Sequence, residues 1–219
     1  MSLCVEFHCH TTYSKDSLVL PADLVATCRS KGIDRVIITD HNTIAGALEA
    51  QAIDPKLVIV GEEIMTTRGE ILAAFVQEEI PAGLTPQETI RRLKEQDAFI
   101  SVSHPFDHTR SGHWQEADLL EILPHIDAIE TFNARCLLPS MNRKAAEFAA
   151  RHGIPSTVGS DAHTLWELGR ATLTLPNFNS ASELRQVIRQ GIPNLRSTGI
   201  HARFASRYAV LSKKLWKKS

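Results

Sequence analysis

The sequence has few of the features that mark membrane-spanning, disulfide-stabilised or nucleic-acid-binding proteins. No apolar run approaches the roughly 20 residues of a membrane span. The first residues also lack the signal-peptide pattern, in which a basic region precedes an apolar stretch. Lysine and arginine (24) nearly balance aspartate and glutamate (25), so net charge indicates neither a nucleic-acid nor an acidic partner. We expect a cytoplasmic protein whose four cysteines, with no metal-finger or Cys-x-x-Cys spacing, are reduced thiols: Cys4, Cys9, Cys28 and Cys136.

Strand and helix patterns alternate along the 219 residues, which is enough chain for one domain with a substantial core. Apolar or β-branched runs predict strands at 5–8, 35–39, 57–60, 70–76, 99–103, 128–132 and 156–158. Helix patterns and end signals predict helices at 21–31, 44–52, 85–96, 115–122 and 139–152. The alternation predicts an α/β domain with a mainly parallel sheet, either open or closed into a barrel of about seven units.

Two histidines, His8 and His10, flank Cys9 at the end of the first predicted strand. Residues i and i+2 of a strand lie on one face, so both imidazoles can reach one point in space while Cys9 points away from it. Neutral imidazole is the commonest metal ligand among protein side chains. The pair alone is weak evidence for a metal site, because short loops also produce it by chance.

Nearly every other predicted strand also ends in a histidine or a carboxylate. In α/β folds, sites are assembled from the carboxyl ends of strands. Gathering these carboxylates in a pocket without a cation would be costly, so the pattern predicts a multinuclear metal site. Imidazole and carboxylate without thiolate suit two or three ions of Zn, Mn or Fe, and closely spaced ions suit hydrolysis at phosphorus. The strand-end groups are Asp40-His41, Glu62-Glu63, His104, Glu130 to Asn133, Asp161 and His163.

These groups stand in an order that resembles the motifs of the PHP (polymerase and histidinol phosphatase) family. The resemblance rests on His8-Cys9-His10, Asp16, Thr39-Asp40-His41, Gly61-Glu62-Glu63, Ser103-His104-Pro105 and Gly159-Ser160-Asp161-Ala162-His163, with Gly169-Arg170-Ala171 after them. It implies a single PHP domain over 1–219, folded as a distorted (β/α)7 barrel with up to three metals at its C-terminal face. The motifs would span 8–163, a PHP-associated segment about 164–200, and a basic helical tail 201–219.

The resemblance also implies roles for single residues. His8, His10 and Asp161 would hold one ion, Glu63 would bridge it to a second, and His104 would bind that second ion. Asp16, His41 and His163 would hold or support a third. Asp40 and Glu130 would orient ligands by hydrogen bonding. The sequence departs from the family at Asn133, which stands where histidinol phosphatases have a histidine and could supply a weaker oxygen ligand, and at Asp16, which replaces a histidine of some members.

The implied reaction is hydrolysis of a phosphomonoester or phosphodiester by a metal-bound hydroxide, with Glu63, Asp161 and His163 as catalytic residues. Candidate phosphate-binding cations are Arg135, which could equally be a surface arginine, and Lys15 and Arg110. Too few residues separate Glu63 from His104 for an inserted helical cap, so we expect a shallow site that takes a nucleotide, a sugar phosphate or a nucleic-acid end. The loop 106–114, with Trp114, would be either a rim of that site or a solvated loop.

The tail 201–219 has six lysines and arginines, no acidic residue, and apolar residues at helical spacing. We expect a helix that packs its apolar face on the barrel; contact with nucleic acid or an anionic surface is the alternative. Two other functions stay open for the whole chain. One is a non-catalytic, metal-stabilised module, which the near-complete ligand set disfavours. The other is a C–N hydrolase of the amidohydrolase type, which would typically place a lysine at a strand end.

Overall fold

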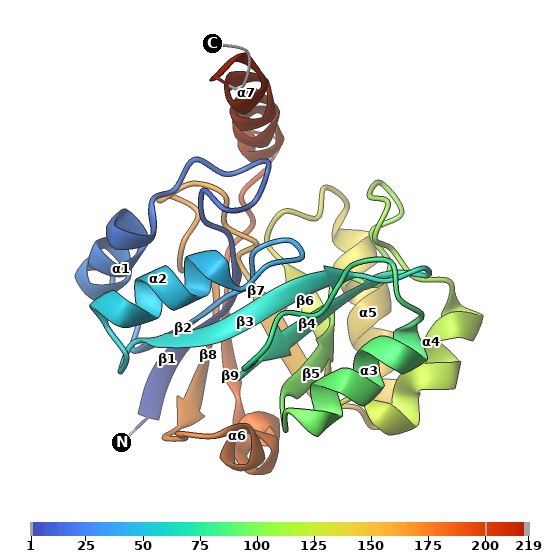
Figure 1. Ribbon diagram of the computed structural model, residues 1–219. Coiled ribbons are helices and arrows are strands. Elements are labelled where there is room, and N and C mark those ends of the chain that lie inside the picture. Colours follow the sequence, from blue (N-terminus) through green and yellow to red (C-terminus); the bar gives the residue numbers. More distant parts are fainter. Residues whose placement is uncertain (1, 200, 217–219) are drawn as a thin grey trace.

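Nine strands form one continuous sheet that curls into a nearly closed barrel (Figure 1). The computed structural model describes residues 2–199 and 201–216. The order across the sheet is β7-β6-β5-β4-β3-β2-β1-β8-β9. The strands are β1 Ser2–Cys9, β2 Arg35–Ile38, β3 Val58–Met65, β4 Glu70–Ala74, β5 Phe99–Val102, β6 Ala128–Asn133, β7 Ser156–Gly159, β8 Ala171–Pro176 and β9 Ile192–Leu195.

The sheet is parallel in two blocks, β1-β2-β3 and β5-β6-β7, and antiparallel where β4 joins them. β8 pairs with β1 in the antiparallel direction, and β9 pairs with β8 in the same way. The barrel closes between β1 and the end of β7, where His10 N donates to Ala162 O at 2.8 Å and Ala162 N donates to His8 O at 3.3 Å. The expected distorted barrel is therefore confirmed, with a mixed rather than uniformly parallel sheet.

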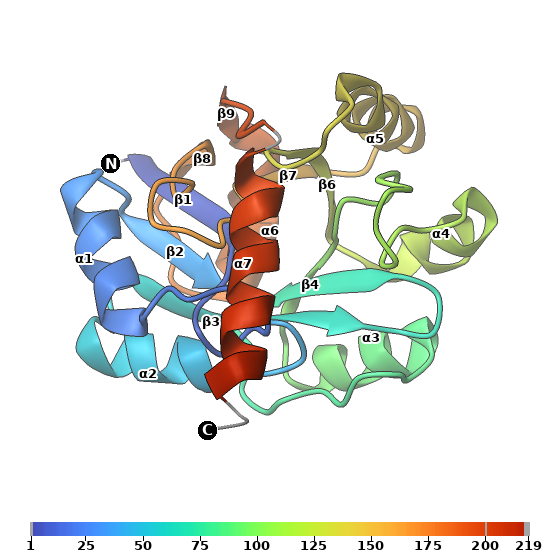
Figure 2. The ribbon, with the colours of Figure 1, turned by 90° about the horizontal axis from the view of Figure 1, so that it is seen from above.

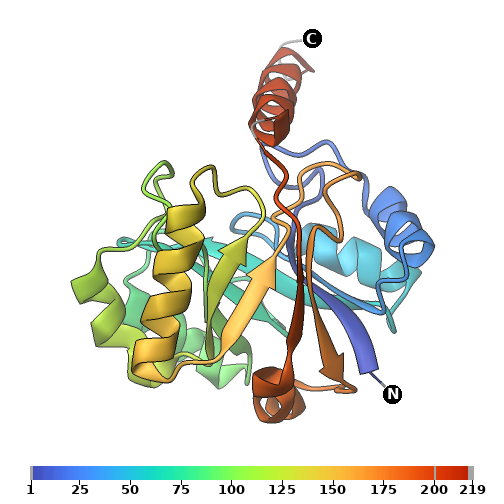
Figure 3. The same cartoon turned by 180° about the vertical axis from the view of Figure 1, so that it is seen from behind.

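Helices surround the barrel and cover its two ends (Figures 1 and 3). α6 lies at the opposite end of the molecule from α7. No helix among residues 2–199 and 201–216 is both long enough and apolar enough to cross a membrane. The helices are α1 Pro21–Ser30, α2 Ala45–Ile53, α3 Pro86–Glu95, α4 Glu116–Ile122, α5 Pro139–His152, α6 Ala181–Val187 and α7 His201–Trp216, with short 3-10 turns at Leu123–His125 and Ile188–Gln190.

The beginning of α3 shows how local sequence fixes an element. Thr85 accepts a hydrogen bond from Glu88 N at 3.2 Å, and Pro86 occupies the first helical turn, where its missing N–H costs nothing. The Glu88 side chain does not return to the cap. It pairs with Arg91 and Arg92 along the helix surface instead, so the reciprocal hydrogen bond of a capping box does not form.

The last helix, α7, lies across the end of the barrel where the parallel strands finish (Figure 2). Polar contacts at both of its ends hold it there: Arg203 donates to Thr109 Oγ1, and Lys213 Nζ donates to Thr12 O at 2.5 Å. Its face toward the barrel is made of small residues such as Ala202 and Ala209.

The expectation that the apolar face of the tail packs on the barrel is wrong. Four large apolar residues of α7 point to solvent and are 60–69% exposed: Phe204, Tyr208, Leu211 and Leu215. Small and polar residues take the inner face because the helix is held by hydrogen bonds rather than by apolar burial. The Trp216 side chain and residues 217–219 lie outside the described residues.

Candidate metal centre

All nine predicted metal-binding side chains meet at one end of the barrel, where the parallel strands finish. β1 supplies the histidine pair, β3 supplies Glu63, and the segments leaving the other strands supply the rest. Each of the nine contacts at least one other member of the group. They are His8, His10, Asp16, His41, Glu63, His104, Asn133, Asp161 and His163.

Glu63 is the centre of this group. Its Oε2 lies 3.3 Å from His8 Nε2, 3.4 Å from His10 Nε2 and 3.0 Å from His41 Nδ1. Its other oxygen, Oε1, lies 3.2 Å from His104 Nε2. Burial raises the pKa of this carboxyl, but the facing His8 and His41 imidazoles outweigh it and hold the pKa well below its usual range. Both oxygens of Glu63 thus face imidazoles.

Asp161 also faces the His8 and His10 imidazoles. Its Oδ1 lies 3.3 Å from His10 Nε2 and 3.6 Å from His8 Nε2. The backbone at Asp161 (φ 51°) and at His104 (φ 21°) lies in the left-handed region, which is strained for residues other than glycine by about 1–3 kcal/mol each. Strain at two of the converging residues fits a site whose geometry serves something other than stability.

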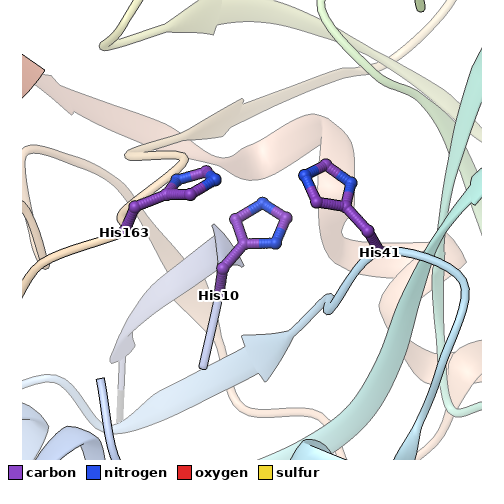
Figure 4. Close-up of side chains that lie close together, drawn as sticks. All are labelled: His10, His41 and His163. Atoms are coloured by element: carbon purple, nitrogen blue, oxygen red, sulfur yellow. The ribbon is translucent and has the colours of Figure 1, made fainter. Parts of the chain in front are cut away.

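Three histidines of the cluster, His10, His41 and His163, lie close together (Figure 4). The ring centroid of His10 lies 4.4 Å from that of His41 and 4.2 Å from that of His163. Asp16 lies between the outer two, with Oδ2 3.1 Å from His163 Nε2 and Oδ1 3.6 Å from His41 Nε2. Three imidazoles and one carboxylate around a common space form a typical donor set for a divalent transition metal.

The unpaired atoms of the cluster fit divalent ions. Two imidazole nitrogens, His8 Nε2 and His10 Nε2, face each other at 3.1 Å. Buried polar atoms without a partner are costly, and here they converge on the same space. Those of the cluster without a hydrogen bond include Asp16 Oδ1, Glu63 Oε2, Asp161 Oδ1 and His163 Nε2.

Two carboxylates, Glu130 and Asp40, determine which ring nitrogen His8 and His10 direct toward the cluster. Glu130 Oε1 accepts from His8 Nδ1 at 2.9 Å, which leaves His8 Nε2 with a free lone pair. Ser14 donates its only proton to Asp40 at 2.6 Å, so its oxygen must accept from His10 Nδ1 at 3.0 Å. Both Nε2 atoms are therefore available as ligands, and Asp40 acts on His10 through Ser14.

The predicted phosphate-binding arginines are already engaged within the protein. Arg135 is buried, contacts His163 Nδ1, and donates to Ala202 O of α7 at 2.6 Å. Arg110 contacts Asp161 and pairs with Asp107 at 3.0 Å, and the two carboxylates hold its pKa above the ordinary value despite burial.

Lys15, the third predicted cation, is exposed, and among the described residues it has no hydrogen-bond or ion-pair partner. It lines a cavity of about 730 Å³ above the cluster. α7 forms part of the cavity wall through Arg203, Phe204 and Arg207, so the expected shallow site is in fact partly covered by the C-terminal helix.

The loop 106–114 was expected to form either a rim of the site or a solvated loop. Its Arg110 and Ser111 line the cavity, but Trp114 does not. Trp114 is only 2% exposed, and its Nε1 donates to Glu70 O at 3.0 Å. It packs against Gly69, where a side chain would clash with the indole ring. Trp114 therefore fixes the beginning of β4 rather than a substrate.

Glu70 is the residue of the cluster that the sequence patterns do not reveal. Its carboxylate lies 3.4 Å from His104 Nε2 and 3.9 Å from His41 Nδ1. It begins a strand, whereas the predicted ligands lie near the ends of strands or after them. Because β4 runs antiparallel to both neighbours, its first residue lies at the same barrel end as their ligands. A prediction that β4 runs antiparallel to its neighbours would have placed Glu70 among the candidate ligands.

Comparison with known proteins agrees with this architecture. The PHP domain model matches residues 6–111, and the PHP-associated model matches residues 139–192. An uncharacterized protein of Methanocaldococcus jannaschii is 36% identical over 178 residues, which cover 80% of this chain and 71% of that protein. A protein of Caldicellulosiruptor saccharolyticus named "Probable phosphatase" is 27% identical over 207 residues, covering 80% of this chain and 86% of that protein.

Among solved structures, PsfC from Pseudomonas syringae has the same fold. The TM-score is 0.71 at 16% sequence identity, and the match covers 96% of this chain and 98% of that one. At this identity the likeness concerns the fold alone.

Proposed function

Because the chain belongs to the PHP domain family, we propose that it is a metal-dependent phosphoesterase acting on a phosphomonoester or phosphodiester of about nucleotide size. The family and a relative named as a phosphatase support a metal-dependent phosphoesterase in general. The observation that carries the proposal is the convergence of imidazole and carboxylate atoms on Glu63 beneath a cavity lined with cations.

In this proposal His8, His10 and Asp161 would hold one ion, and Glu63 would be shared between it and a second. Asp16, His41 and His163 would hold a third. Divalent ions bound there would supply positive charge for the phosphoryl oxygens and would acidify water for hydrolysis. Asp40 and Glu130 keep the β1 imidazoles aimed at the ions.

The cations around the cavity are proposed to bind and orient the phosphate. Lys15 and Arg207 both line it, and neither has a hydrogen-bond or ion-pair partner among the described residues. Arg110 and Arg135 are held in place by carboxylates and by α7, so they act as fixed positive charges beside the phosphate. The leaving group can take its proton from His163, Asp161 or water. Of the two side chains, only His163 lines the cavity.

The cavity favours a small substrate. Its volume of about 730 Å³ lies within the roughly 300–1,000 Å³ of ordinary small-molecule sites. Tyr13 and Phe204 add aromatic surface to its mouth, which suits a base or a sugar. A nucleotide or a sugar phosphate fits these properties.

Turnover assays on metal-loaded protein test this function. We expect Mn²⁺-dependent phosphate release from p-nitrophenyl phosphate or AMP. Both His10→Ala and Asp161→Ala should reduce it to background, and the exposed Asp23→Asn should leave it unchanged. Metal-replete protein that is inactive on every phosphoester but cleaves a cyclic amide would replace this proposal with C–N hydrolysis. Inactivity on both would favour a non-catalytic module.

A nucleic-acid end is the second candidate substrate, and α7 is the observation that favours it. Exposed Phe204 and Tyr208 stand beside Arg203 and Arg207 on this helix, and aromatic rings with neighbouring cations bind single strands. If so, turnover of 5′-phosphorylated oligonucleotides should fall steeply with salt. Salt-insensitive turnover of oligonucleotides would exclude a role for the α7 cations in binding them, and absence of turnover would exclude this substrate.

A further inference from the structure

Glu70 has a buried carboxylate that no hydrogen bond among the described residues holds. The residue is 7% exposed and begins β4. Its oxygens face imidazoles instead: Oε2 lies 3.4 Å from His104 Nε2, and Oε1 lies 3.9 Å from His41 Nδ1. A carboxylate buried in this way is stable only beside a cation or in its protonated form.

The surrounding chain leaves room for this carboxylate. Gly112 lies against it, and a Cβ at that position would stand 1.9 Å from Glu70 Oε2. Glu70 N donates to Gly112 O at 3.0 Å, and Trp114 Nε1 donates to Glu70 O at the same distance. The loop after β5 thus fixes the Glu70 backbone on both sides while leaving its side chain free to reach the cluster.

Asn133, by contrast, has no free lone pair to offer an ion. Its Oδ1 accepts from Arg135 N at 2.9 Å and from Arg110 Nη2 at 3.4 Å. Its Nδ2 donates to Glu130 Oε2 at 3.1 Å and to Asp161 Oδ2 at 3.2 Å. Since an amide oxygen has two lone pairs, both are used within the protein.

We propose that Glu70, rather than Asn133, completes the second metal position together with Glu63 and His104. The three donor atoms are close: Glu63 Oε1 and Glu70 Oε2 lie 3.2 Å and 3.4 Å from His104 Nε2. This assignment rests on the metal-dependent function proposed above. A carboxylate in place of a neutral ligand adds a negative charge and a hard oxygen donor, so the affinity of the second position for Mn²⁺ should lie nearer its affinity for Zn²⁺ than at the positions rich in imidazole.

The test counts ions rather than turnover. Purified full-length protein is loaded with Mn²⁺, and bound metal per chain is measured by elemental analysis after equilibrium dialysis. Coupling between neighbouring Mn²⁺ ions is followed by electron paramagnetic resonance. We expect Glu70→Gln to bind one ion fewer than the unmodified chain and to lose coupling at the Glu63 bridge. Gly112→Ala, which displaces the carboxylate without removing it, should weaken the same ion.

Two variants serve as references. Glu62→Gln changes a neighbouring buried glutamate whose Oε2 accepts from Ile80 N at 3.0 Å, away from the cluster, and should bind the full number of ions. Asn133→Ala should also bind the full number. Circular dichroism spectra and melting curves for each variant show whether it is folded.

The outcomes separate this inference from the function on which it rests. If the unmodified chain binds ions and hydrolyses a phosphoester while Glu70→Gln keeps every ion, the Glu70 assignment alone is overturned. The same holds if Asn133→Ala loses the ion. A full-length protein that binds no divalent ion at all overturns the proposed function and the assignment together.

Discussion

At the scale of single residues, the cluster depends on groups that bind the second ring nitrogen of its histidines, the one that does not face the other ligands. His10 points one nitrogen at Glu63 and Asp161 because its other nitrogen is bound to Ser14, whose oxygen in turn faces Asp40. Asp40 touches none of the proposed ions, yet it fixes the ring orientation. Such indirect contacts commonly alter metal affinity by about 10–100-fold.

Asp40→Asn tests this dependence. The amide keeps the size of the side chain but lacks the negative charge of the carboxylate, which accepts hydrogen bonds from Thr11 and Ser14. We expect the dissociation constant of the ion assigned to His10 to rise about 10–100-fold in a Mn²⁺ titration. Asp23→Asn, an identical change on the exposed side of α1, should leave it unaltered. Equal Mn²⁺ affinities in the two variants would show that Asp40 does not orient His10 for metal binding.

The limits of sequence reasoning are clearest at two of these residues. Asp161 and His163 could be located because the chain places them directly after a predicted strand, and strand ends meet at one edge. Glu70 precedes its strand, and only the antiparallel pairing of β4 brings it to that edge. Likewise, the engagement of Arg135 by α7 depends on a contact between segments far apart in the chain.

At the scale of elements, α7 gives the site a wall that the barrel alone would not supply. Arg203, Phe204 and Arg207 of this helix line the cavity. The helix is held by hydrogen bonds at its ends, whereas its large apolar side chains face outward. The predicted helices and strands up to residue 159 match the structure within a few residues. The position of α7 could not be predicted, because helical spacing identifies an apolar face but not the surface that it meets.

Arg207→Ala tests the contribution of this wall. Loss of one charged hydrogen bond to the substrate phosphate should raise KM about tenfold while leaving the bound ions unchanged. Lys214→Ala removes the same charge from the same helix, but Lys214 does not line the cavity, so its KM should stay near the original value. Steady-state kinetics on the preferred phosphoester measure both. Parallel increases would indicate a general effect of charge rather than a specific contact.

At the scale of the whole molecule, the cluster joins strands from both parallel blocks of the barrel. Glu63 comes from one block, whereas Glu130 and Asp161 come from the other. An ion held between them binds the folded chain and not the unfolded one, so binding should stabilise the entire barrel.

Thermal unfolding measures this coupling. Free Mn²⁺ at about 100 times its dissociation constant should raise Tm by about 5–10 °C relative to protein in a chelator. His10→Ala, which lacks a proposed ligand, should show a much smaller rise. A Tm independent of Mn²⁺ in the unmodified chain would show that these side chains do not hold ions in the folded state.

The closure of the barrel between β1 and the end of β7, here called the seam, also limits when the protein can fold during synthesis. Glu6, in β1, accepts a hydrogen bond at 3.0 Å from the backbone N of Ser160, 154 residues later in the chain. During synthesis the first strand leaves the ribosome long before its partner at this seam exists. Contacts between such distant residues form slowly, because a long loop must close before they are made. A nascent chain that ends before Asp161 therefore carries most of the histidines but cannot assemble the cluster.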